Sequence, residues 1–269
     1  MPFWKKSHPG SSEEEKRWER WRAILNVLED RHVASVEELV DTTGSRESVI
    51  EEDLATLCAE GLVKRTARNG VTLEGYHPEK TLEERAVENI EAKRQIGRLV
   101  AEKYIQPGMV LFLDASTTVK AVAPFIAGQQ VTLITNCLSL IAELRSLDFA
   151  GRIICTGGKY RAKSNSLVGE SACREVTEHT ADLALLGTDG ISPKMEIMEA
   201  DPEEARLKRA MLQHAGKTIV MALPNKFGDA SLLPVGHLSK VEALISSSFP
   251  DPEFVKSARE TGVRLECPA

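Results

Sequence analysis

The feature that most constrains the fold is an alternation of short apolar runs with amphipathic stretches, which occupies the last two-thirds of the chain. Apolar runs of strand length occur at Met109–Leu113, Val131–Thr135, Arg152–Cys155, Asp182–Gly187, Thr218–Ala222 and Ala243–Ser246. Most of them are separated by segments of helical periodicity. Strands that alternate with helices are typical of a parallel sheet covered by helices on both faces. We therefore expect an α/β domain over residues 79–269.

An amphipathic segment at the start of this domain predicts one linker helix over residues 81–106. The segment begins at Thr81 and ends at Pro107-Gly108, where proline cannot continue a helix.

The residues before this domain predict short helices. Trp18, Trp21, Leu25 and Leu28 fall on one helical face. Ser35 is a suitable N-cap for a second helix, and Thr42–Ser45 form a turn. A third helix would bury Ile50, Leu54, Leu57 and Cys58 and end at Gly61.

A β-hairpin is expected after the third helix. Leu62–Thr66 and Val71–Leu73 flank Ala67-Arg68-Asn69-Gly70, and Asn-Gly strongly favours a tight hairpin turn. Three helices and a hairpin predict a winged helix-turn-helix domain over residues 18–78, which binds DNA. A small helical subdomain that binds nothing, or binds another protein, is the alternative. The charge-dense residues 1–17 predict a flexible segment.

The overall charge balance argues against nucleic acid as a partner. The chain carries 34 Lys and Arg against 40 Asp and Glu, a net charge of −6. Four of these six negative charges lie in residues 1–75, which hold 11 basic and 15 acidic side chains. The five cysteines are scattered without a C-x-x-C pair, and no apolar run is long enough to span a membrane. We expect a cytoplasmic protein with no membrane partner and neither a disulfide framework nor a zinc site.

A ligand site is expected where strands end, because open α/β sheets bind ligands beyond the carboxyl ends of their strands. Four such ends carry polar or glycine residues: Asp114–Thr118, Thr135–Cys137, Thr156–Lys159 and Gly187–Gly190. Ser116, Thr117 and Thr118 are suited to bind an anion at a helix start, although they could be ordinary helix caps. Lys226 is a further cation after a strand, or else a solvated loop lysine.

Catalytic and metal-binding signatures are absent from the sequence. It contains no P-loop, no G-x-S-x-G and no H-E-x-x-H motif, and its six histidines are dispersed. Asp114 and Asp189 are a weak candidate acid–base pair. Glu204 and Lys208 have a spacing that usually marks a surface ion pair. We therefore expect no enzyme activity, no metal and no cofactor other than a small-molecule effector.

The order of the motifs over residues 18–247 resembles the DeoR family of bacterial transcription regulators. The sensor half carries the closer match, through Leu113–Thr118, Thr135–Cys137, Gly157–Arg161, Leu167–Gly169, Ala181-Asp182, Leu186–Ile191 and Lys226–Gly228. Any one of these motifs is weak, but seven in order at family-like spacing are strong.

The resemblance implies a regulator, typically a repressor, with a winged helix-turn-helix and a Rossmann-like effector domain related in fold to ribose-5-phosphate isomerase. It implies operator DNA, a phosphorylated sugar or similar anion, and a second copy of the chain (a dimer or tetramer) as partners. Carried over by position, the effector-binding residues would be Asp114, Ser116, Thr117, Thr118, Asn136, Gly157, Gly158, Lys159, Asp189 and Lys226.

The recognition helix departs from the family pattern. The family's Val-Ser-x-x-Thr-Ile-Arg-Arg-Asp-Leu reads Ser45-Arg46-Glu47-Ser48-Val49-Ile50-Glu51-Glu52-Asp53-Leu54 in this chain, so Glu51 and Glu52 replace paired arginines. Carboxylates repel DNA phosphates, although a glutamate can accept a hydrogen bond from cytosine N4. The residues expected at DNA are Arg46, Glu47, Ser48, Glu51, Glu52, Lys64, Arg65 and Arg68.

Two other functions are compatible with the residues. One is a metabolite sensor with weakened DNA binding, whose acidic helix face, formed by Glu47, Glu51, Glu52 and Asp53, meets a protein partner. The other is a sugar-phosphate isomerase, suggested only by the shared fold.

Overall fold

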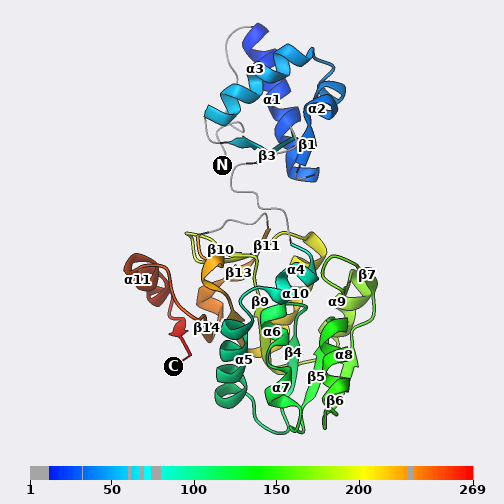
Figure 1. The fold of residues 1–269 in the computed structure, drawn as a ribbon, viewed down its shortest axis with the longest axis vertical. Coiled ribbons are helices and arrows are strands. Elements are labelled where there is room, and N and C mark those ends of the chain that lie inside the picture. The colour runs from blue at the N-terminus through cyan, green and yellow to red at the C-terminus, as the bar shows by residue number, and fades with distance from the viewer. Residues whose placement is uncertain are drawn as a thin grey trace. The chain divides into compact units, whose positions relative to one another are not determined.

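The computed structural model describes residues 12–31, 33–59, 62–66, 70–73, 80–228 and 233–268. The chain divides into two compact units, Met1–Pro78 and Glu79–Ala269. Figure 1 shows the elements of both units. Among the described residues, no helix is both long and apolar enough to cross a membrane.

The first unit is a winged helix-turn-helix. Its described residues form helices α1 (Ser12–Arg31), α2 (Val36–Thr43) and α3 (Glu47–Ala59), and an antiparallel sheet of order β1-β3-β2. The wing strands are β2 (Val63–Arg65) and β3 (Gly70–Leu73). The third strand, β1 (Val33–Ser35), was not predicted; it pairs with β3. The predicted fold class of this unit is confirmed.

Local signals set the boundaries of α2. The Ser35 hydroxyl accepts from the Glu38 backbone N–H at 3.1 Å, and the Glu38 carboxylate accepts from the Ser35 N–H at 2.8 Å, which is a capping box. Gly44 ends the helix with a φ of +63°, a conformation that glycine adopts without steric cost. The expected helix end at Gly61 and the turn at residues 67–69 lie outside the described residues.

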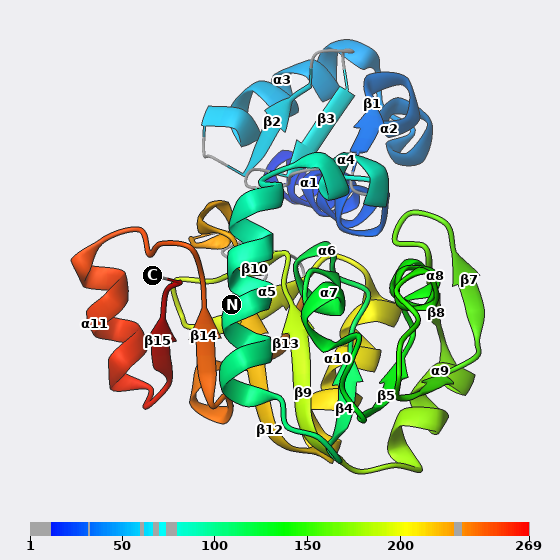
Figure 2. The same ribbon diagram turned by 60° about the horizontal axis from the view of Figure 1, so that its bottom comes forward.

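The second unit is built on a parallel sheet that, in the described residues, has seven strands in the order β15-β14-β12-β9-β4-β5-β6 (Figure 2). Every neighbouring pair in it is parallel. Its strands are β4 (Val110–Leu113), β5 (Thr132–Thr135), β6 (Arg152–Cys155), β9 (Ala181–Gly187), β12 (Ala215–Met221), β14 (Ala243–Ile245) and β15 (Arg264–Glu266). The α/β prediction is confirmed, and β15 is the strand that it missed.

Side chains alternate between the two faces of this sheet, so each face has its own apolar core. Leu111 and Leu113 of β4 pack with helices α5 (Ile90–Tyr104), α6 (Thr117–Lys120), α7 (Ala123–Ile126) and α8 (Leu138–Ser146). Phe112, between them, packs with α9 (Glu170–Thr177) and α10 (Pro202–His214). Helix α11 (Pro252–Glu260) contacts β15 and belongs to a further apolar cluster that includes residues of β12 and β14.

Short strands outside the main sheet were not predicted, because two to five residues carry too little periodicity to recognise. They are the hairpin β7 (Lys159–Arg161) and β8 (Ser166–Val168), and a sheet of β10 (Gly190–Ile191), β11 (Glu196–Glu199) and β13 (Leu233–His237). The second group matters for the site, because it follows directly after β9.

The prediction of one linker helix over 81–106 was wrong. The segment forms α4 (Leu82–Val87) and α5, separated by Glu88 in an extended conformation and by Asn89 in the left-handed region with a φ of 50°. Tertiary contacts keep α4 separate from α5, because Leu82 is buried and its N–H donates to the Lys163 carbonyl at 2.9 Å. Helical periodicity runs through the break, which is why the sequence did not reveal it.

Candidate functional site

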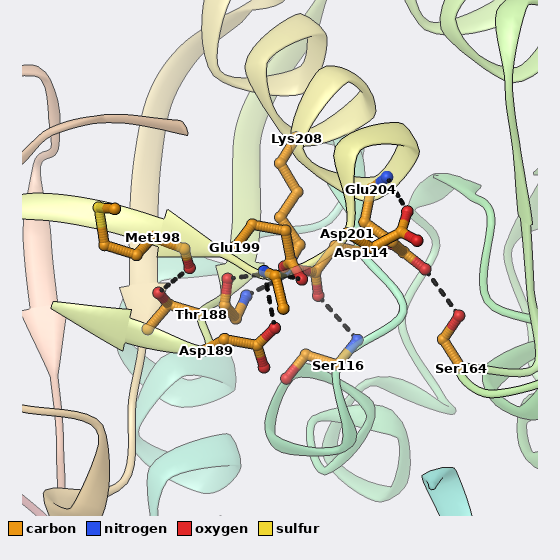
Figure 3. Close-up of polar contacts among 12 residues, drawn as sticks. Asp114, Ser116, Ser164, Thr188, Asp189, Met198, Glu199, Asp201, Glu204 and Lys208 are labelled. Carbon is orange, nitrogen blue, oxygen red and sulfur yellow. Dashed lines mark hydrogen bonds and ion pairs between the residues drawn. The ribbon is translucent and has the colours of Figure 1, made fainter. Parts of the chain in front are cut away.

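A polar pocket lies at the carboxyl ends of the central strands β4 and β9 (Figure 3). Its lining combines two cations, three carboxyl groups and three hydroxyl groups. The residues are Arg85, Ala115, Ser116, Ser164, Thr188, Asp189, Glu199, Glu204 and Lys208. These side chains come from segments more than a hundred residues apart, and the strand order β9-β4 brings them together.

Asp114 organises the floor of the pocket. It is 1% exposed; its Oδ1 accepts from the Ser116 N–H at 2.9 Å, and its Oδ2 accepts from the Gly187 N–H at 2.8 Å. A side chain at Gly187 would collide with the Ser116 loop, because a Cβ there would lie 2.2 Å from Ser116 Oγ. Asp114 and Gly187 therefore join the ends of β4 and β9 and fix where Ser116 stands.

Lys208 is a buried ammonium whose three N–H donors each have an acceptor. Its Nζ contacts a Glu199 carboxylate oxygen, lies 3.2 Å from Asp114 Oδ2, and donates to the Gly187 carbonyl at 3.2 Å. Burial lowers the pKa of Lys208, but the neighbouring carboxylates outweigh burial and raise it above its ordinary value. Because an ammonium has three donors, Lys208 holds the site together and has no donor left over for a ligand anion.

The expectation that Glu204 and Lys208 form a surface ion pair was wrong. Glu204 is 5% and Lys208 7% exposed. Glu204 Oε1 accepts from both Ser164 Oγ and Ser166 Oγ, each at 2.7 Å. The i, i+4 spacing puts both side chains on the face of α10 that meets the sheet, so they line the pocket.

Asp189 stands at the turn between β9 and β10, opposite Lys226. Its Oδ1 lies 3.8 Å from Lys226 Nζ. Burial raises the pKa of Asp189, but a hydrogen bond with Glu199 and the charges of Lys208 and Lys226 outweigh burial and lower it below its ordinary range. Asp189 is thus an ionised carboxylate at the pocket wall.

Four of the ten effector residues expected from sequence lie at or beside the pocket. Ser116 and Asp189 line it, Asp114 lies beneath it, and Lys226 pairs with Asp189. Thr117 and Thr118 are buried in α6, and the Thr118 N–H is capped by Ser116 Oγ at 3.1 Å.

The remaining expected residues do not line the pocket. Asn136 is fully buried, and among the described residues its amide oxygen and nitrogen have no hydrogen-bond partner. Gly157 and Gly158 form a turn with φ of +65° and +115°, where a Cβ on Gly158 would lie 2.5 Å from the Val168 carbonyl oxygen. Lys159 is exposed and pairs with Glu203 at 3.2 Å.

Sequence reasoning missed most of the pocket lining. Arg85 and Lys208 carried some signal, since Arg85 lies in the predicted linker helix and Lys208 has helical spacing to Glu204. Glu199 carried none, because it ends a four-residue strand in a loop-like stretch. Among the described residues, no group of three or more His, Cys, Asp or Glu side chains could hold a metal ion.

The residues expected at DNA that the structure describes lie in or next to α3 and on wing strand β2. Arg46, just before α3, is exposed, as are Glu47, Ser48 and Glu52 on α3, and Lys64 is half-buried on β2. Glu51 forms an ion pair with Arg65 of β2. Arg68 lies outside the described residues.

Asp53 does not belong to the acidic face that was expected on this helix. It is 3% exposed, and its carboxylate accepts from Arg20 Nε at 2.7 Å and from Trp21 Nε1 at 2.9 Å. Asp53 therefore ties α3 to α1, and only the glutamates face solvent.

Comparison with known proteins agrees with this architecture. The model of the DeoR C-terminal sensor domain matches residues 88–248. The chain belongs to the DeoR family. It is 30% identical to the HTH-type transcriptional regulator GlpR of Haloferax volcanii, over 92% of this chain and 96% of that protein. It is 28% identical to the glycerol-3-phosphate regulon repressor of Escherichia coli, over 93% and 99%, and 31% identical to the HTH-type transcriptional repressor GlcR of Bacillus subtilis, over 92% and 95%.

Solved structures resemble this DeoR-family chain only weakly. Ribose 5-phosphate isomerase A from Methanocaldococcus jannaschii has a TM-score of 0.38 at 11% identity, over 52% of this chain and 55% of that chain. A likeness of this degree carries no argument about activity. The full-length relatives are named as regulators and repressors, so the protein is a DeoR-family transcriptional regulator with a helix-turn-helix unit and a sensor domain.

Proposed function

We propose that this regulator represses transcription by binding operator DNA through α3 and the wing. We further propose that an anionic polyhydroxy metabolite, such as a phosphorylated sugar, binds the pocket and causes the protein to release the DNA. The observation that carries the sensor half of this proposal is the pocket itself. It combines cations with buried hydrogen-bonding carboxyl and hydroxyl groups, but among the described residues holds no metal-binding cluster.

Cations beside the pocket support an anionic ligand. Lys93 is 5% exposed, and its Nζ donates to the Arg85 carbonyl, next to the pocket wall. Burial, together with the charges of Arg85, Lys226 and Lys120, lowers the pKa of Lys93 to about 8, against the opposing effect of Glu88. Such mutual repulsion among cations is relieved when an anion binds between them. Arg85 is the natural phosphate contact, because a guanidinium binds phosphate through paired donors.

The DNA half rests on α3 and β2. The exposed side chains are Arg46 and Ser48 as donors, and Glu47 and Glu52 as acceptors that suit cytosine or adenine amino groups. Phosphate contacts would come from Lys64 and Arg65. A recognition helix of this composition reads bases with little help from backbone charge, so its affinity should depend on the operator sequence.

The test is a titration of the full-length protein against its own promoter DNA, followed by fluorescence anisotropy. Specific binding that weakens with added salt is expected, and glycerol 3-phosphate, fructose 1-phosphate and glucose 6-phosphate would be screened for the ability to release the DNA. Affinity equal to that of random DNA at low salt would refute operator binding and favour a protein partner. Size measurement by light scattering would decide between the dimer and the tetramer that we propose.

The effector site is tested with Ser116→Glu, which places a carboxylate where the anion would bind. We expect ligand to stop raising the melting temperature, while Ser146→Glu on the exposed side of α8 leaves the response intact. A normal response in Ser116→Glu would remove Ser116 from the site. Turnover of a sugar phosphate by the protein would instead revive an isomerase activity.

A further inference from the structure

Glu199 stands in the pocket wall beside Asp189, and nothing in the sequence marks it as a site residue. We propose that Glu199 is a specificity-determining residue: it keeps its proton, and with Asp189 it forms a carboxyl–carboxylate pair that recognises hydroxyl groups of an anionic polyhydroxy ligand. This inference rests on the proposed function of the pocket as an effector site.

The geometry brings the two carboxyl groups together. One backbone N–H, that of Ala200, donates to Asp189 Oδ2 at 3.2 Å and to Glu199 Oε1 at 3.0 Å. Figure 3 shows the side chains of Asp189 and Glu199. Two oxygens that share one donor must lie close to each other. Two ionised carboxylates at such a distance repel strongly, whereas a single proton between them converts repulsion into a hydrogen bond.

The surrounding charges leave one carboxyl group without a countercharge. The charged groups around the Glu199–Asp189 pair are Asp114 after β4, Glu204 and Lys208 on α10, Lys226 after β12 and Arg85 on α4. Together with the pair, four carboxyl groups face three cations. Lys208 is shared between Glu199 and Asp114, and Lys226 lies nearer Asp189.

The proton belongs on Glu199 because Glu199 is the more buried partner. Burial raises the pKa of Glu199 well above its ordinary value, and although Lys208 lowers it, the neighbouring Asp189 raises it further. The pKa of Asp189 is lowered, as described above. The pair therefore consists of a Glu199 carboxylic acid that donates to an Asp189 carboxylate.

This pair explains which ligands the pocket can select. A sugar hydroxyl both donates and accepts hydrogen bonds, so it can insert into the pair, accepting from the Glu199 carboxyl and donating to the Asp189 carboxylate. Ser164, Thr188 and Glu204 extend the same polar wall. Inorganic phosphate or a simple alkyl phosphate has no sugar hydroxyl to make these two hydrogen bonds, so it gains less binding free energy. The site should therefore prefer polyhydroxy phosphates.

The proposal also fixes the sign of a pH dependence. A bound anion adds negative charge near Glu199, so its pKa is higher in the complex than in the free protein. The affinity for the ligand is therefore highest below the pKa of Glu199 in the free protein. It falls as the pH rises above that pKa, by at most about tenfold per pH unit.

The binding test compares the wild-type protein, Glu199→Gln and the control Glu196→Gln, which is the same substitution on the same strand outside the pocket. Dissociation constants for glycerol 3-phosphate, fructose 1-phosphate, glucose 6-phosphate and propyl phosphate would be measured between about pH 7 and pH 9, where the second phosphate ionisation (pKa about 6) is complete.

We expect hydroxylated probes to bind at least about tenfold more tightly than propyl phosphate, because the loss of hydrogen bonds weakens binding by about this factor. Wild type and Glu196→Gln should lose affinity as the pH rises. Lys93, whose pKa is about 8, contributes equally to the pH dependence of all three proteins. Glu199→Gln, which keeps a donor but cannot ionise, should lose the additional part that comes from Glu199.

A measurement without ligand separates this inference from the proposed function. Infrared spectra of the wild-type protein at pH 7 should show a protonated carboxyl band that is absent in Glu199→Gln and retained in Glu196→Gln. If Glu199→Gln does not fold, Asp189→Asn serves as the test variant. Removing the Asp189 charge removes the repulsion that keeps the proton on Glu199, so the titration of the protonated carboxyl band should shift to lower pH. Absence of the band, or an equal pH dependence of binding in Glu199→Gln, would overturn the inference. Failure of every probe to bind would count against the proposed ligand class, and the infrared result would still decide the state of Glu199.

Discussion

Three consecutive acidic residues on α3 have three different roles, which shows how little residue type says without its surroundings. Asp53 is buried against Arg20 and Trp21, Glu51 pairs with Arg65 of the wing, and Glu52 is exposed. The net negative charge of the helix therefore overstates its repulsion of DNA. Arg65, a cation expected to contact DNA phosphate, is already paired with a carboxylate of the same unit.

Replacing Glu51 by Gln should strengthen DNA binding, because the change frees Arg65 for a phosphate contact and removes a negative charge. We expect affinity at low salt to rise about three- to tenfold, and the slope of log affinity against log salt to steepen by up to about one. Anisotropy titrations at several salt concentrations measure both quantities. Glu52→Gln is the matched control and should give a smaller gain at an unchanged slope. An equal effect of the two substitutions would show that the ion pair with Arg65 is not the cause.

Gly187→Ala should damage the pocket from within the sheet. The new Cβ would lie 2.2 Å from Ser116 Oγ, so the Ser116 loop must move. We expect a loss of stability of about 1–3 kcal/mol, typical of overpacking, and a reduced ligand response. Urea unfolding and ligand-induced thermal shifts measure these effects. Gly128→Ala, where a Cβ meets nothing within 4 Å, is the control, and equal losses in both variants would contradict the steric explanation.

At the scale of elements, periodicity predicted the main strands and helices well because it is a local property. It failed where tertiary contacts override it, most clearly at the break between α4 and α5. Val87 and Ile90 flank the break and are exposed, at 72% and 60%, although their apolar character would suit a buried helical face. Docking of Leu82 and the left-handed Asn89 decide the path of the chain instead.

Asn89→Ala should destabilise the second unit, because alanine tolerates the left-handed conformation less well than asparagine. The expected cost is about 1 kcal/mol, and helix content should rise if α4 and α5 merge. Asn89→Gly, which accepts the same backbone angles freely, should be near neutral. Urea unfolding and circular dichroism are the measurements. Equal stability of the alanine and glycine variants would mean that the backbone at residue 89 can relax.

At the scale of the whole molecule, the two units have separate apolar cores. One cluster of buried side chains lies within residues 21–71, and the others lie within residues 96–263. Separate cores allow each unit to unfold by itself, so a ligand of one unit need not stabilise the other directly.

Calorimetry of the full-length protein should therefore show two transitions. Leu39→Ala should lower the free energy of unfolding of the first unit only, and Leu185→Ala that of the second unit only, each by about 2–5 kcal/mol. An effector should raise only the second transition, and operator DNA the first. A single transition shifted by both substitutions would show that the units unfold as one cooperative body.

The sequence by itself determined the order of elements, the two architectures and the edge of the sheet where ligands bind, because apolar periodicity, caps and glycine turns act over a few residues. It also led to Ser116 and Asp189, which stand directly at strand ends. Only the tertiary structure decided the chemistry of the pocket. Asp114, Glu199 and Lys208 come from a strand end, a short hairpin and a helix, and their contacts depend on the strand order and on which face of α10 is buried. Electrostatic interactions among buried groups are set by distances of a few ångströms, and no local pattern in a chain records those distances.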